Sequence, residues 1–364
     1  MNYTTGQLIT FLLSLFLFGC NSINHKTVDV NEQSKQAILQ DSLHNLDSLV
    51  LKYRVKNAYE SIKYAKQAGD VAHEINTPIA RVKANISLGN AYSVFRIDSG
   101  LYFYNKAMTG IDSLNLTDLK GKVLYNMGML NRSTGNYRNC LILIDSALRY
   151  SIKVNDFITM SNSFNTLGNI YYNIGEKVQA RKMFDSAYAV ANRQTLSLQM
   201  GSALGNLARL EGDNNKSKML QKRAISYLEG RIGSEEPMAL ILINLGYHCQ
   251  VVDSAIYYFN RAINMVSVEF APEVIIGAYN NMAYCYLYKG DVNSAEKCIA
   301  DHALPVSIKT NNVDWQATVY DTYADVLKQK GSATEATVYK NKSIEARKIY
   351  RASVSTILTG LKKY

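Results

Sequence analysis

Proline is scarce in this chain of 364 residues, and so are the alternating patterns that mark β-strands. Only 4 prolines occur, against about 5% of residues in average proteins, which favours long helices joined by short turns. No long stretch alternates apolar and polar residues as a half-buried strand does. Since 47% of the residues are hydrophobic, the chain can still bury a large core. These features predict an all-α protein.

Sequence patterns that mark catalytic sites are missing as well. The chain contains no H-E-x-x-H, no G-x-S-x-G, no phosphate-binding P-loop and no dinucleotide fingerprint. Its five histidines are scattered, without the spacing of metal ligands. We therefore expect that the protein is not an enzyme and that it holds no metal ion and no cofactor.

Clustered basic residues are also absent, although the net charge is +10. Lysine and arginine are spread along the chain, with no run of five or more basic residues. A protein that reads nucleic acid needs a basic stripe or a reading motif, and neither occurs. Solvated helix faces account for the charge, with an acidic partner as the alternative. No nucleic-acid partner is expected.

What recurs in the chain is an order of large and small residues. Its clearest copy has four residues on one helix face, then a glycine, then three residues on the face of a second helix: Phe164, Leu167, Gly168, Tyr171, Gly175, Ala180, Phe184 and Ala187. This order predicts two antiparallel helices whose backbones approach closely where the small residues lie.

The order resembles the tetratricopeptide (TPR) repeat, and with Ser161 as position 1 seven positions of the repeat agree in register. The last position of the pattern recurs along the chain at Ala65, Ala107, Ala147, Ala187, Ala224, Ala262, His302 and Ser343. The spacing is about 40 residues, longer than the 34 of the family. The resemblance implies an α-α superhelix of about eight helical hairpins over residues 34–343, with a capping helix over 344–364.

The turns and the exceptions of the pattern also carry expectations. A glycine precedes a capping or acidic residue inside five copies: Gly135-Asn136, Gly175-Glu176, Gly212-Asp213, Gly290-Asp291 and Gly331-Ser332. Glycine can end a helix in the left-handed conformation, and Asn, Asp or Ser can cap the next helix. By contrast, Gln221 stands where the repeat has a large apolar residue, and His302 where it has alanine.

The N-terminus carries an apolar stretch, from Leu8 to Phe18, that is too short to span a bilayer as a helix. It has the length of the apolar core of a secretory signal peptide, although no lysine or arginine precedes Lys26. The next residues, Gly19-Cys20, resemble the cleavage site of bacterial lipoproteins. This resemblance implies a signal peptide over 1–19, a lipid anchor on Cys20 and a flexible tether over 20–33. Lipoprotein sorting rules further imply an outer-membrane location facing the periplasm; secretion without lipid and an uncleaved anchor are the alternatives.

Four further cysteines occur without any C-x-x-C pair. Cys140 occupies a small-residue position of its repeat and is expected to fill the core. Cys285 and Cys298 are expected on the two helices of one hairpin. Spacing alone leaves open whether they form a disulfide.

In the TPR family the first helix of each hairpin lines a concave groove. The corresponding residues here are Asn90, Tyr125, Arg132, Asn162, Asn165, Asn169, Tyr172, Asn173, Asn206 and Arg209. Asparagine offers both a donor and an acceptor, so this lining suits the backbone of an extended peptide. The alternative is an ordinary solvated helix face. The basic residues with which some TPR domains hold a C-terminal carboxylate are replaced by Ile86, Asn162 and Thr166, so that particular activity is not implied.

The resulting hypothesis is a non-catalytic scaffold in the cell envelope that binds a protein or peptide partner in this groove. One alternative is an extracytoplasmic sensory element that works with a separate kinase or transcription regulator, as similar TPR segments do. Another is a lipoprotein that captures glycans, which rests on the 26 tyrosines, many of them at core positions.

Overall fold

The computed structural model of this protein describes residues 25–134 and 136–361, which contain helices and no strand. The helices, in chain order, are α2 (His25–Tyr53), α3 (Ala58–Ile75), α4 (Pro78–Tyr92), α5 (Ile97–Ser113), α6 (Thr117–Ser133), α7 (Tyr137–Val154), α8 (Phe157–Asn173), α9 (Lys177–Arg193), α10 (Ser197–Leu210), α11 (Asn214–Leu228), α12 (Glu235–Tyr247), α13 (Val252–Met265), α14 (Pro272–Tyr288), α15 (Val292–Lys297), the π-helix η1 (Cys298–Ala303), α16 (Leu304–Lys309), α17 (Val313–Lys330) and α18 (Ala333–Leu361).

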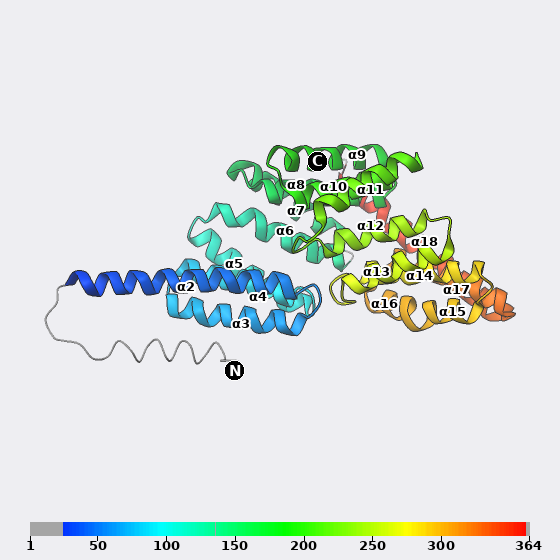
Figure 1. Cartoon of the computed structure of the whole chain (residues 1–364), viewed down its shortest axis with the longest axis horizontal. Helices are drawn as coiled ribbons and strands as arrows, with labels where there is room; N and C mark the ends of the chain where they lie inside the picture. Colours follow the sequence, from blue (N-terminus) through cyan, green and yellow to red (C-terminus); the bar gives the residue numbers. More distant parts are fainter. Residues whose placement is uncertain (1–24, 135, 362–364) are drawn as a thin grey trace.

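Consecutive helices pair as antiparallel hairpins, beginning with α2 and α3 and ending with α17 and α18. In the seventh hairpin of the described chain, α15, η1 and α16 together form the arm that packs on α14. Figure 1 shows the hairpins stacked in chain order. The α-α superhelix expected from the repeat pattern is therefore confirmed.

The five hairpins from α4–α5 to α12–α13 share a close contact where a small residue of the first helix meets a large residue of the second. A Cβ added at Gly168 would overlap the Phe184 ring, and a Cβ at Gly89 would lie 2.5 Å from the Tyr104 ring. Phe184, Ala180 and Ala187 are completely buried. The large and small residues of the repeat thus pack against each other as the sequence pattern predicts.

Gln221 marks the hairpin that departs from the repeat pattern. It is completely buried, and its Nε2 donates to Ser217 Oγ over 3.3 Å. Its Oε1 has no hydrogen-bond partner among the described residues. Gly205 receives Ile241 of the next hairpin, and the small–large contact within the hairpin lies one turn earlier, where a Cβ added at Gly201 would lie 2.5 Å from Leu228.

The seventh hairpin corrects the expected position of His302. The π-helix η1 has one more residue per hydrogen-bonded turn than an α-helix, so Ala303 is buried and His302 is exposed. The displaced imidazole stacks on the Tyr279 ring, with centroids 4.1 Å apart. Pro305 gives the physical reason, because it lacks the N–H that an α-helix would bond to the carbonyl of Asp301.

The turn glycines follow the expectation except at one position. Gly175, Gly290 and Gly331 adopt the left-handed conformation, with φ of 85°, 77° and 91°. Gly212 does not; there α10 ends at Leu210 and the chain leaves it through the extended Glu211, so no left-handed residue is needed. Gly135 lies outside the described residues.

The ends of the repeat array differ from the expected boundaries. The helix α2 already begins at His25, within the segment 20–33 expected as a tether, and no glycine or proline interrupts residues 25–56. The helix α18 runs through Ser343 to Leu361, so the expected capping segment continues the last hairpin. The signal peptide and Cys20 lie outside the described residues. Cys140, Cys249, Cys285 and Cys298 are free thiols, so Cys285 and Cys298 are not bonded to each other.

The superhelix also contacts itself across its concave side. The Ser267 N–H donates to the Val55 carbonyl over 3.0 Å, which joins the α2–α3 turn to the segment before α14. The Arg54 guanidinium lies 5.5 Å from the centroid of the Phe270 ring at the same contact. In Figure 1 the α2–α3 turn accordingly lies near α13. The concave side is thereby partly enclosed.

Replacing Gly168 by alanine tests the close helix contact. Gly168→Ala is expected to lower the free energy of unfolding by about 1–3 kcal/mol, because the added methyl group overlaps the Phe184 ring. Gly69→Ala is the matched control: Gly69 lies inside α3 with no atom within 4 Å of an added Cβ, and the change should stabilise by about 0.5–1 kcal/mol. Urea denaturation measures both. Effects of the same sign in the two variants would contradict the packing described.

Candidate functional site

A cavity of about 600 Å³ opens on the concave side of the superhelix, within the size range of small-ligand sites. Its walls come from the first helices of successive hairpins, chiefly α6, α8, α10 and α12, and from the α2–α3 turn. Most of the groove residues expected from the sequence line it: Asn90, Tyr125, Arg132, Asn162, Asn165, Asn169, Asn206 and Arg209.

The other two expected groove residues lie beside the cavity. The Tyr172 ring supports the Arg209 guanidinium, whose Cζ lies 4.3 Å from the ring centroid. The Asn173 carbonyl accepts a hydrogen bond from the Tyr350 hydroxyl of α18 over 2.6 Å. Tyr172 therefore acts on the cavity through Arg209, whereas Asn173 faces the C-terminal helix.

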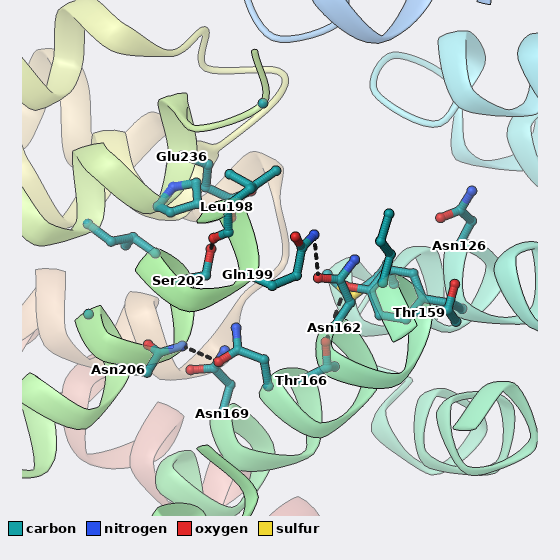
Figure 2. A pocket seen from close by; sticks show the side chains of 18 of the residues that line it. Asn126, Thr159, Asn162, Thr166, Asn169, Leu198, Gln199, Ser202, Asn206 and Glu236 are labelled. Carbon is teal, nitrogen blue, oxygen red and sulfur yellow. Dashed lines mark hydrogen bonds between the residues drawn. The ribbon is translucent and has the colours of Figure 1, made fainter. Parts of the chain in front are cut away.

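Hydrogen bonds between α8 and α10 orient the central asparagines (Figure 2). Three donors of α10 bond the amide oxygens of α8: Gln199 Nε2 to Asn162 at 3.4 Å, Asn206 Nδ2 to Asn165 at 2.9 Å, and Arg209 Nη1 to Asn169 at 3.3 Å. The α8 side chain is the acceptor in all three pairs. The Nδ2 groups of these asparagines have no hydrogen-bond partner in the described part of the chain, so α8 presents three donors to the cavity.

The same arrangement recurs between α4 and α6. The Asn90 oxygen accepts from Asn126 Nδ2 over 3.0 Å and from the Tyr104 hydroxyl over 2.8 Å. Burial raises the pKa of Tyr104 to about 12, so the hydroxyl keeps its proton and remains a donor. Side-chain amide oxygens of α4 and α8 thus already accept hydrogen bonds from within the protein wall.

The charged residues of the cavity wall interact most closely at Arg132. Arg132 Nη1 lies 3.9 Å from the Glu273 carboxylate of α14. Burial alone lowers the pKa of Arg132, but the carboxylates of Glu273 and Glu236 outweigh it and the pKa is raised. Burial raises the pKa of Glu236, against the opposing effect of Arg132.

The wall as a whole is positive. Four basic residues line the cavity, against two acidic ones: Arg54, Lys122, Arg132 and Arg209, with Asp156 and Glu236. One acidic side chain is already engaged, because Asp156 Oδ1 accepts from the Thr159 N–H as the cap of α8. No group of three or more potential metal ligands gathers among the residues the structure describes. The site is therefore suited to hydrogen bonding and to binding an anionic group.

Sequence reasoning missed several cavity residues for two different reasons. Gln199 and Ser202 occupy groove positions of the fifth copy and line the cavity; the same positional rule would have found them. Glu236 precedes the repeat pattern of its hairpin, and Arg54 arrives from the α2–α3 turn only because the superhelix contacts itself. The repeat pattern does not predict such positions.

No protein-family model and no curated protein matches the sequence. Solved structures do resemble the fold. The Rap conjugation gene regulator of plasmid pLS20 in complex with the Phr* peptide has a TM-score of 0.56 at 13% identity, over 88% of this chain and 97% of its own. A Rap protein complexed with Competence and Sporulation Factor has a TM-score of 0.54 at 13% identity, over 90% and 98%. The apo quorum sensor NprR from B. thuringiensis has 0.52 at 15% identity, over 88% and 92%.

These similarities establish the fold as a TPR-like α-α superhelix. They extend over nearly the whole length of each neighbour, so the likeness concerns the complete array of hairpins. At 13–15% identity the likeness concerns the fold alone.

The raised pKa of Glu236 predicts how stability depends on pH. When the pKa of a carboxyl is higher in the folded than in the unfolded protein, ionisation of that carboxyl destabilises the fold. The protein therefore loses stability as the pH rises from the unfolded-state pKa of Glu236 through its raised folded-state pKa. Glu236→Gln removes this loss, so its free energy of unfolding should exceed that of the wild type at pH 8 and approach it at pH 4. Urea denaturation at the two pH values measures the difference. The control is Glu229→Gln at an exposed position; a Glu236→Gln variant that is equally destabilised at both pH values contradicts the prediction.

Proposed function

We propose that this protein is a non-catalytic scaffold that binds a peptide, or an extended segment of a partner protein, in the cavity on its concave side. The observation that carries the proposal is the set of three Nδ2 donors on α8. The oxygen of each of these side-chain amides accepts a hydrogen bond from Gln199, Asn206 or Arg209 of α10. The Nδ2 donors are therefore oriented before any ligand binds. Such preorganisation reduces the entropy lost on binding.

The spacing of these donors suits a peptide backbone. Asn162, Asn165 and Asn169 follow one another along one face of α8, and the first and last are about 10 Å apart at 1.5 Å per residue. An extended peptide rises about 3.3 Å per residue, so three to four residues cover this distance with carbonyl oxygens as acceptors. The fold likeness to a Rap regulator solved with the Phr* peptide supports the same class of ligand.

A sensory role is the second candidate, and the contact between Val55 and Ser267 favours it. That contact lies beside Phe270 and Arg54, which both line the cavity, so an occupant of the cavity would act directly on the closure of the superhelix. A bound peptide would then be a signal passed to a separate kinase or transcription regulator. Identifying the proteins that are captured together with the peptide-bound form would distinguish the scaffold from the sensory role.

We further propose that a lipid on Cys20 anchors the protein in the cell envelope, at the outer membrane and facing the periplasm. The support is the apolar stretch from Leu8 to Phe18 followed by Gly19-Cys20. Among the described residues no helix is both long and apolar enough to span a bilayer. The array of hairpins would follow the anchor directly, through the residues between Cys20 and α2.

Substituting two asparagines by aspartate tests the binding site. Asn162→Asp with Asn165→Asp keeps the oxygens that accept from Gln199 and Asn206 but removes two donors. Retention of a pool of random decapeptides on the immobilised protein, measured by mass spectrometry, should fall about 30-fold, as expected for two hydrogen bonds of about 1 kcal/mol each.

The matched control for that variant is Asn105→Asp with Asn192→Asp, two exposed positions on the outer helices α5 and α9. This pair adds the same charge outside the cavity and should leave retention unchanged. Equal retention by the cavity variant and the wild type would exclude the asparagines from binding.

Metabolic labelling tests the anchor. When the protein is produced in a bacterium grown with radioactive palmitate, the wild-type chain should incorporate label and the Cys20→Ala variant should not. Cys249→Ala is the control, because Cys249 is one of the free thiols of the folded part. Label that persists in Cys20→Ala would refute the lipid anchor.

A further inference from the structure

Arg209 is held rigidly at the cavity wall. Its guanidinium stacks on the Tyr172 ring at 4.3 Å. The Nη1 group donates to Asn169 Oδ1 over 3.3 Å and to Asn206 Oδ1 over 3.1 Å. Both hydrogens of Nη1 are therefore used, and the plane of the guanidinium is fixed by the ring beneath it.

No carboxylate neutralises this guanidinium. Arg209 takes part in no ion pair within the described residues, and the nearby Glu211 is bonded to Arg181 at 3.5 Å instead. Of the acidic residues that line the cavity, Asp156 caps α8, and Glu236 acts on Arg132. A half-buried cation without a counter-ion has lost part of its hydration and keeps its attraction for an anion.

The unused edge of Arg209 has a definite chemistry. Nε–H and Nη2–H are parallel donors on one side of the guanidinium, and neither has a partner in the described part of the chain. This edge matches the two oxygens of a carboxylate and binds them with two parallel hydrogen bonds.

We propose that Arg209 binds a carboxylate of the peptide ligand side-on through Nε and Nη2. The proposal rests on the peptide-binding function and specifies its ligand as one that carries a carboxylate at this point of the cavity. The site differs from the carboxylate-holding pattern of some TPR domains, whose basic positions are occupied here by Ile86, Asn162 and Thr166. The carboxylate is either the C-terminus of the peptide or an Asp or Glu side chain.

Three pools of random decapeptides separate these sources: acid-free with an amidated C-terminus, acid-free with a free C-terminus, and amidated with Asp and Glu included. Wild-type protein should retain one carboxylate-bearing pool about tenfold better than the acid-free amidated pool. Preference for the free C-terminus identifies a terminal carboxylate, and preference for the acidic pool identifies a side chain. Arg209→Gln, which removes the charge and both parallel donors, should abolish the preference, and its melting temperature shows whether the fold is kept.

Arg209→Lys is the second variant, since it keeps the charge but loses the two parallel donors; it should retain only a weak preference. An undiminished preference in Arg209→Gln would overturn the proposal. So would equal retention of all three pools by the wild type, which leaves peptide binding itself intact. Retention of no pool by the wild type would overturn peptide binding and this proposal together.

Discussion

Close approach of two helix backbones is the constraint on which the rest of the structure depends. Gly168 leaves room for the Phe184 ring against α8, and the completely buried Ala180 and Ala187 let α9 lie equally close. Because this contact uses only one face of each first helix, the opposite face is free of packing requirements. Polar side chains can therefore occupy it at no cost to the core, and successive hairpins place them along one continuous wall.

The sequence predicts the features that depend on local periodicity. It does not predict those that depend on the contact of the superhelix with itself. The order of large and small residues predicts the hairpins, and the repeat positions predict that residues such as Asn165 and Asn206 share a wall, where they prove to be bonded. Arg54 could not be assigned to the cavity, because its position depends on a contact between Val55 and Ser267. Such a contact depends on the accumulated rotation of several hairpins, which no single repeat encodes.

Two local departures show where a repeat pattern gives the wrong detail for a physical reason. Near Pro305 a missing N–H produces the π-helix, and the register shifts by one residue so that Ala303 replaces His302 in the core. At Gly212 the chain turns through the extended Glu211, so its glycine is not needed for a left-handed turn. In both places the packing of the hairpin is preserved while the backbone route changes, which explains why the fold could be predicted more accurately than its turns.

Two arginines of the cavity wall, Arg132 and Arg209, differ in the partners that the fold gives them. Arg132 of α6 faces Glu273 of α14 across the concave side, so its charge is balanced by an ion pair that joins two distant hairpins. Arg209 bonds only neutral amide oxygens of α8 and α10, which orient it without cancelling its charge. A cation that is fixed in place but not neutralised keeps its attraction for an anion, and the neighbouring Nδ2 donors extend that attraction along the wall. The cavity can thus combine a charged contact at one point with hydrogen bonds to a backbone beside it.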